Sequence, residues 1–142
     1  MPLAALPGLD GVFAGTRPDN LGVQQGELAA CPSSPNCVSS QAEDDHAIAP
    51  LTYSRDHQAA QATLVKILQN QPRTQIIEQR PDYVYAEFAS RLMGFVDDAE
   101  FYFPSDTKTI EVRSAARLGE SDLGVNRRRL EQIRLALQEL GA

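Results

Sequence analysis

Two segments, 56–70 and 124–140, repeat apolar residues at the spacing of one helical face. These faces are Ala60, Leu64, Ile67 and Leu68 in the first segment, and Leu130, Ile133, Leu137 and Leu140 in the second. Ser54 or Asp56 can cap the first helix, and Pro72 ends it. The pattern predicts two amphipathic helices, each with one buried face.

Between the helices, four runs have the alternation and composition of strands, at 74–79, 82–90, 95–103 and 108–116. Residues 51–53 form a further, short candidate strand. The links between the four runs are short and rich in turn formers, which favours antiparallel hairpins over parallel crossovers. We therefore expect an α+β two-layer sandwich, with a four-stranded antiparallel meander and both helices on one face.

Residues 1–50 have no regular period, and they hold six of the nine prolines and five of the nine glycines. Apolar anchors nevertheless recur through the segment, at Leu3, Leu6, Leu9, Val12, Phe13, Leu21, Val23 and Leu28. We predict an extended arm, 1–50, packed on a domain formed by 51–142. A disordered acidic tail is the alternative, because the segment carries one arginine against six acids.

Alternation along the strands places one carboxylate, Asp97, on an apolar face. Three interpretations are open: an acid or base with a raised pKa, a strand-end Asp paired with an Arg or with loop N–H groups, and a β-bulge at 97–98 that swaps the faces. The paired strand-end Asp is favoured. The opposite face mixes charges and aromatic rings, namely Tyr85, Glu87, Asp98, Glu100, Tyr102, Arg113 and Arg117. Ion pairs on a solvated sheet explain this set, as does a recognition surface covered by the arm.

The second helix begins with Arg127, Arg128 and Arg129, although the helix dipole favours acids there. Ser121 or Asp122 suits the N-cap. We expect the arginines to engage the acidic arm, Asp97 or Asp98, or an external anion. No glycine-rich loop supports phosphate binding.

The chain has 142 residues, a formal net charge of −6 and a pI near 4.8. This balance argues against nucleic-acid binding, which depends on neutralising phosphates. No apolar run approaches the roughly 20 residues of a membrane span. The N-terminus lacks a basic region followed by an apolar run, so it does not read as a secretory signal, and we expect a cytoplasmic protein.

Cys31 and Cys37 bracket a stretch with two prolines. Buried free thiols are the favoured interpretation, a small disulfide loop comes next, and a metal site with His46 and His57 is the least favoured because its spacing matches no compact zinc module. Cys37 could also pair with a histidine for catalysis, but no nucleophile, metalloprotease or phosphate-loop motif is present. We predict no metal and no cofactor.

Five stretches resemble a family known only as domain of unknown function 1499. They are Gly15-Thr-Arg-Pro-Asp-Asn-Leu-Gly22, Cys31-Pro-Ser-Ser-Pro-Asn-Cys-Val-Ser-Ser40, Gly94-Phe-Val-Asp-Asp98, Val112-Arg-Ser-Ala-Ala-Arg117 and Gly119-Glu-Ser-Asp-Leu-Gly-Val-Asn-Arg-Arg-Arg129. The first stretch is most similar to the cyanobacterial and plant-plastid branch. The resemblance implies no activity, but it emphasises Asn36, Cys37, Ser39, Ser40, Asp97, Asp98, Arg113, Ser114, Arg117, Asp122, Asn126 and Arg127. We expect the acids, the strand arginines and the helix start to converge at one end of the sheet.

These observations favour a non-catalytic binding or assembly module that recognises a protein partner or a small anionic ligand through its acid–arginine cluster. The branch resemblance suggests a photosynthetic-membrane setting, peripheral to the thylakoid, as the alternative location. A second hypothesis is a small-ligand enzyme, with Asp97 or Asp98 as acid or base and Arg113 or Arg127 orienting an anionic group. A third is a thiol redox or metal module at Cys31 and Cys37.

Overall fold

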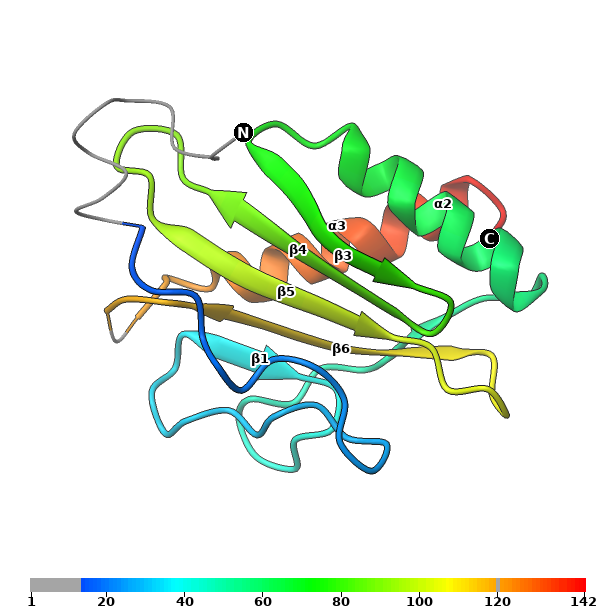
Figure 1. Cartoon of the computed structure of the whole chain (residues 1–142), viewed down its shortest axis with the longest axis horizontal. Helices are drawn as coiled ribbons and strands as arrows, with labels where there is room; N and C mark the ends of the chain where they lie inside the picture. The colour runs from blue at the N-terminus through cyan, green and yellow to red at the C-terminus, as the bar shows by residue number, and fades with distance from the viewer. Residues whose placement is uncertain (1–13, 120) are drawn as a thin grey trace.

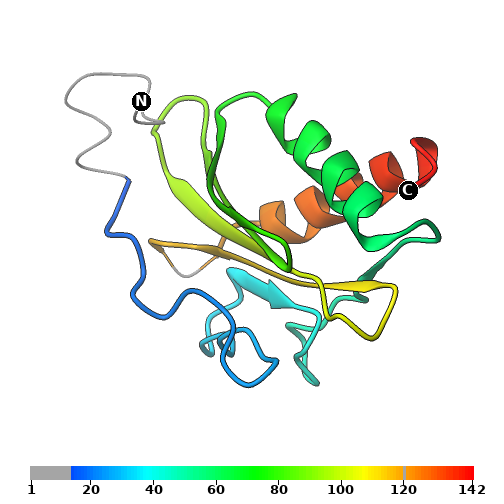
Figure 2. The same ribbon diagram turned by 45° about the vertical axis from the view of Figure 1, so that its right-hand side comes forward.

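A computed structural model describes residues 14–119 and 121–142 (Figure 1). Its strands are β1 (Cys37–Ser39), β2 (Leu51–Thr52), β3 (Thr74–Arg80), β4 (Tyr83–Ala89), β5 (Val96–Tyr102) and β6 (Thr109–Ala116), and its helices are α2 (His57–Gln69) and α3 (Val125–Glu139). The strands form a single antiparallel sheet, and both helices lie on one of its faces (Figure 2). The predicted α+β sandwich is confirmed.

The four-stranded meander of β3 to β6 has the expected order, but the sheet has six strands rather than four. Both β1 and β2 pair with the outer edge of β6, where Cys37 lies opposite Ala115 and Leu51 lies opposite Ile110. Strands of two or three residues are too short to show a period, which is why the pattern missed β1. The described arm is thus joined to the sheet by strand pairing, and a domain boundary at residue 50 remains a prediction.

The predicted strand faces are correct, because the register of β5 with both neighbours runs without interruption through 97 and 98. The proposed bulge at that position is therefore wrong, and the sheet's irregularity lies between Ile76 and Glu78 of β3. The core is built from the helix-facing side of the strands, with Val84, Ala86, Phe88, Ala99, Phe101, Ile110 and Val112 among its members.

Asp56 is the N-cap of α2 and accepts a hydrogen bond from the Ala59 N–H at 2.7 Å. All the predicted apolar positions of both helices are buried except Leu140, which is 54% exposed. Leu140 is the C-cap of α3, so it lies beyond the last residue that faces the sheet.

The other face of the sheet is covered by the described part of the arm, from residue 14 on, rather than by solvent (Figure 2). Leu21, Val23 and Leu28 pack against Tyr83 and Tyr85 of β4. The other predicted anchors, Leu3, Leu6, Leu9, Val12 and Phe13, lie outside the described residues. Among the residues that the structure describes, no helix is long and apolar enough to cross a membrane.

Candidate functional site

Arg117, just past the end of β6, is the centre of a polar network between the sheet and the arm. Its Nε and Nη2 donate to the two carboxylate oxygens of Asp98, both at 2.8 Å, and its Nη2 also donates to Glu87. The side chains of Arg117 and Asp98 are 7% and 2% exposed. Two-point pairing of this kind fixes the position of both groups as well as neutralising their charges.

Tyr85 and Arg17 complete this network. The Tyr85 hydroxyl lies 2.5 Å from Asp98 Oδ1 and 2.8 Å from Glu87 Oε2, and Arg17 Nε donates to Glu87 at 2.7 Å. Burial raises the pKa of Tyr85, as do the neighbouring carboxylates, so its hydroxyl stays protonated. Burial alone would raise the pKa of Glu87, but hydrogen bonds from Tyr85, Arg17 and Arg117 outweigh it and lower that pKa. Arg17 is the arm's own contribution, so the network joins arm to sheet.

A second pair, Glu100 and Arg113, lies beside this network. Glu100 Oε2 accepts hydrogen bonds from the Tyr83 hydroxyl at 2.5 Å and from the Gly22 N–H of the arm at 2.6 Å. Its Oε1 lies 4.0 Å from Arg113 Nη1, and both Oε1 and Arg113 Nε are buried without a hydrogen-bond partner. Burial raises the pKa of Glu100 and lowers the pKa of Arg113.

On the helix-facing side of the sheet, Asp97 meets Arg129 of α3, and Arg129 Nη2 lies 2.9 Å from Asp97 Oδ2. This is the paired strand-end Asp that the sequence favoured. Burial raises the pKa of Asp97, and the charge of Arg129 opposes that rise. Arg129 Nη1 also donates to Asn126 Oδ1 at 2.9 Å, and its guanidinium lies 4.3 Å from the centroid of the Phe88 ring.

Asn126 is fully buried and connects three elements. Its Oδ1 accepts from the Ser114 hydroxyl of β6 at 2.5 Å, and its Nδ2 donates to Asp122 at 2.6 Å. Asp122 also accepts from the N–H groups of Gly124 and Asn126, at 2.8 and 3.0 Å. Asp122 therefore does the hydrogen bonding of a cap, although Gly124 is the N-cap residue by backbone conformation. These bonds lower the pKa of Asp122 against the opposing effect of burial.

Asn36, Ser39 and Ser40, which the family resemblance emphasises, hold the chain in and beside β1. Asn36 donates to the Gly119 carbonyl at 2.6 Å, and Ser40 Oγ accepts from the Val112 N–H at 2.8 Å. Ser39 Oγ accepts from the Gln41 N–H at 3.1 Å. Arg127 of α3 donates to the carbonyls of Ala47 and Asp45, at 2.7 and 3.0 Å. Arg127 thus binds the arm, through backbone carbonyls rather than through its acids.

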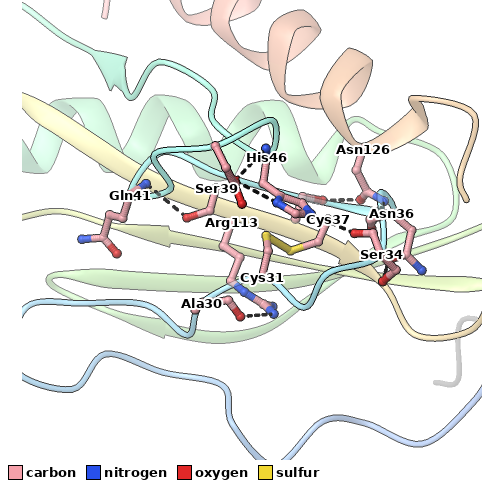
Figure 3. The surroundings of a disulfide bond; sticks show 12 residues. Ala30, Cys31, Ser34, Asn36, Cys37, Ser39, Gln41, His46, Arg113 and Asn126 are labelled. Carbon is pink, nitrogen blue, oxygen red and sulfur yellow. Dashed lines mark hydrogen bonds and ion pairs between the residues drawn. A yellow bond between two sulfur atoms is a disulfide. The ribbon is translucent and has the colours of Figure 1, made fainter. Parts of the chain in front are cut away.

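Cys31 and Cys37 form a disulfide that closes the turn before β1 (Figure 3). The structure therefore differs from the favoured interpretation of free buried thiols, and it matches the disulfide alternative. His46 lies against the same turn, where its Nε2 is 2.9 Å from the Ser34 carbonyl oxygen (Figure 3). Its Nδ1 is 2.9 Å from Asp44 Oδ1. The Ser34 hydrogen bond and the Asp44 carboxylate raise the pKa of His46. Within the described residues, no group of three or more His, Cys, Asp or Glu side chains could hold a metal ion.

The predicted site residues lie near one end of the sheet but on its two sides. Asp98, Arg113 and Arg117 lie under the arm, whereas Asp97 and Ser114 lie under α3, where they meet residues at its start that include Asn126, itself bound to Asp122. Sequence reasoning missed Arg17 and Tyr83 as members. It expected one of the three helix arginines to engage Asp97, and Arg129 does so, but it placed Arg127 in the cluster instead. A signal that favours Arg129 is present in the sequence, since Arg129 lies one helical turn after Asn126 and on the same side of α3.

A comparison with curated proteins finds no match, and neither does a comparison with solved structures. A family model described as "Protein of unknown function (DUF1499)" matches residues 27–137, which include the disulfide, the whole sheet and nearly all of α3. The chain therefore belongs to the DUF1499 family.

Proposed function

We propose that this chain is a non-catalytic binding or assembly module, in which the acid–arginine network holds the arm on the sheet and gives the surface a fixed shape. The single observation that carries the proposal is the pairing of the candidate catalytic carboxylates. Asp98 binds Arg117 beneath the arm, and Asp97 binds Arg129 beneath α3. A general base must reach a proton on its substrate, whereas these carboxylates are already paired with arginines and are buried beneath the arm or α3.

A partner would not be recognised by the buried acid–arginine network itself. Buried ion pairs of this kind are costly to break, because removing one partner leaves an uncompensated buried charge. A ligand that displaced Arg117 from Asp98 would have to supply an equivalent cation. Recognition is therefore assigned to the exposed surface, and the cluster keeps the arm and loops in position.

A small-ligand enzyme is the second candidate, and the observation that favours it is the Glu100–Arg113 pair. These are buried, oppositely charged groups with one unpartnered polar atom each. An anionic substrate group could bind Arg113 there, with Glu100 acting on a proton. Arg127, which the sequence grouped with this cluster, faces the 45–47 backbone instead.

A thiol redox module is the third candidate. Its support is that Cys31 lines a surface cavity of about 430 Å³ together with His46. The disulfide also favours an oxidising compartment over the cytoplasm. The branch resemblance of residues 15–22 supports a photosynthetic-membrane setting.

The test is native mass spectrometry of the chain purified without reductant from its own host, combined with Asp98→Asn. If the chain is a binding module, its mass should be that of the chain alone or of the chain with a macromolecular partner. Asp98→Asn should then lower its free energy of unfolding, since a structural ion pair is broken. Removing a catalytic carboxylate typically leaves stability unchanged or raises it. A stoichiometric small-molecule adduct together with a fully stable Asp98→Asn variant contradicts the proposal.

A further inference from the structure

Apolar side chains protrude from one end of the sheet. Leu92 and Met93, in the turn between β4 and β5, are 74% and 46% exposed, and Leu123, just before α3, is 84% exposed. Leu118, in the connection from β6 to α3, and Val125, the first residue of α3, are each about two-fifths exposed. Single exposed leucines are ordinary, whereas a group on adjacent loops marks an interaction site.

Contacts show that these loops are neighbours. The Arg117 N–H donates to the Val96 carbonyl at 3.1 Å, which brings the end of β6 beside the start of β5. Arg128 of α3 donates to the Leu123 carbonyl at 2.8 Å. Figures 1 and 2 both place the turn after β4 and the connection from β6 to α3 at the same end of the molecule.

This end carries three arginines without an acidic partner among the described residues, while the nearby acids Asp97 and Asp122 are bound to Arg129 and Asn126. Arg73, Arg91 and Arg128 form no ion pair with any residue that the structure describes. Arg73 lies beside the end of β4, where its side-chain Nε donates a hydrogen bond to the Ala89 carbonyl at 3.3 Å. Arg91 follows two residues later in the chain. Arg91 is next to Leu92 in the chain and Arg128 contacts the Leu123 carbonyl, so guanidinium groups lie beside the protruding leucines in a protein with a net charge of −6.

Two of these arginines line a surface cavity of about 230 Å³ between β4 and α3. Its lining includes Arg73, Phe88, Ala89, Val125 and Arg128. Arg129 lies there too, but its guanidinium is held by Asp97 and Asn126. Free donors of Arg73 and Arg128 beside a small hollow suit an anionic oxygen group.

We propose that this end of the sheet docks on a bilayer that contains anionic phospholipids. Leu92, Met93 and Leu123 enter the boundary between headgroups and acyl chains, and the arginines contact the lipid phosphates. Apolar side chains flanked by cationic ones are the composition that binds an anionic bilayer surface, because the free energies of apolar burial and of electrostatic attraction add. The inference names a partner for the binding module proposed above and rests on that proposal.

A second copy of the chain fits this surface poorly. A two-fold interface places the same patch on both sides, so Arg73, Arg91 and Arg128 would face their own copies. Like charges brought together at an interface oppose association. An anionic surface of a different kind removes this conflict.

The test is flotation of the full chain with vesicles of phosphatidylcholine alone, or of phosphatidylcholine mixed with phosphatidylglycerol. We expect binding to the mixed vesicles, weakened by salt. Arg128→Gln and Arg73→Gln should each reduce the partition coefficient about fivefold, which is the usual effect of one arginine at an anionic surface. Leu123→Ser should reduce it severalfold without altering the salt dependence.

Matched controls are Arg55→Gln and Leu135→Ser. Arg55 also forms no ion pair with the described residues, and Leu135 is 58% exposed on α3. Arg55 adjoins Ser54, whose N–H donates to the carbonyl of Ala142 at the other end of the molecule. Both controls should bind as the wild type does, and circular dichroism checks that every variant is folded.

Equal binding to both vesicle types, or equal losses in patch and control variants, overturns the inference. So does competition by inorganic phosphate with no effect of Leu123→Ser, which would identify a free-anion site. A concentration-dependent dimer that Leu123→Ser abolishes would identify a second copy instead. None of these results touches the binding-module proposal, which fails separately if native mass spectrometry finds a small-molecule adduct and Asp98→Asn is fully stable.

Discussion

Replacing Arg117 with methionine tests whether the buried network holds the arm. The substitution leaves Asp98, which is 2% exposed at its side chain, without its cation, and it leaves Glu87 with Arg17 alone. Breaking a buried pair by removing one partner costs about 3–5 kcal/mol. In a chain of this size that loss corresponds to a fall in Tm on the order of 10 °C.

The assay is urea unfolding followed by circular dichroism, with Arg80→Met as the matched control. Arg80 pairs with Glu78 at 3.0 Å, but both side chains are about half exposed. An exposed pair contributes less than about 1 kcal/mol, so the control should unfold close to the wild type. Arg117→Lys keeps the charge but loses the two-point geometry, and its stability should lie between those of the wild type and Arg117→Met.

The pH dependence gives an independent check. Hydrogen bonds to Glu87 hold its folded pKa below the ordinary value of 4.5, so its stabilisation is present above that value and is lost as pH falls through the folded pKa. The difference between wild type and Arg117→Met should therefore shrink in acid. Equal losses in Arg117→Met and Arg80→Met, or a difference that grows in acid, would refute the reasoning.

Three further results are expected. Replacing both Cys31 and Cys37 with serine should lower the free energy of unfolding by about 2 kcal/mol, the loop-entropy value for so short a loop, and adding reductant to the wild type should reproduce the loss. Asn126→Ala should cost about 2 kcal/mol in thermal unfolding, because Asp122 and the Ser114 hydroxyl each lose a buried partner, whereas Asn70→Ala at the exposed end of α2 should cost little. Because burial raises the folded pKa of Glu100, its ionisation should lower stability as pH rises from 4.5 through that pKa. Glu100→Gln should therefore make the fall of the urea midpoint across this range less steep, leaving the part due to Asp97.

Alternation along β4, β5 and β6 was enough to predict which side chains face the helices and which face the arm. The rule has a period of two, and no bulge interrupts it around Asp97 and Asp98. Asp97 could therefore be placed beside the core from sequence. Which arginine would pair with Asp97 could not be predicted, because the angle and position at which α3 crosses the sheet decide which of its arginines lies beside that carboxylate.

Successive helical positions turn by 100°, so Arg127 and Arg129 point to different sides of α3. Arg127 reaches the carbonyls of residues 45 and 47, and Arg129 reaches Asp97. The sequence grouped Arg127 with the acids because it could not rank three consecutive arginines. The disulfide was likewise undecided, since a spacing of six residues suits both bonded and free cysteines.

The two edges of the sheet restrict how any partner can be recognised. The β6 edge is already occupied by β1 and β2, and the β3 edge carries a bulge and ends in the polar run Glu78, Gln79 and Arg80. Short covered edges, bulges and charged residues are the features by which natural sheets resist adding a foreign strand. Whatever binds this chain therefore meets side chains and loop tips rather than open backbone, and its specificity can change through loop substitutions that leave the sheet intact.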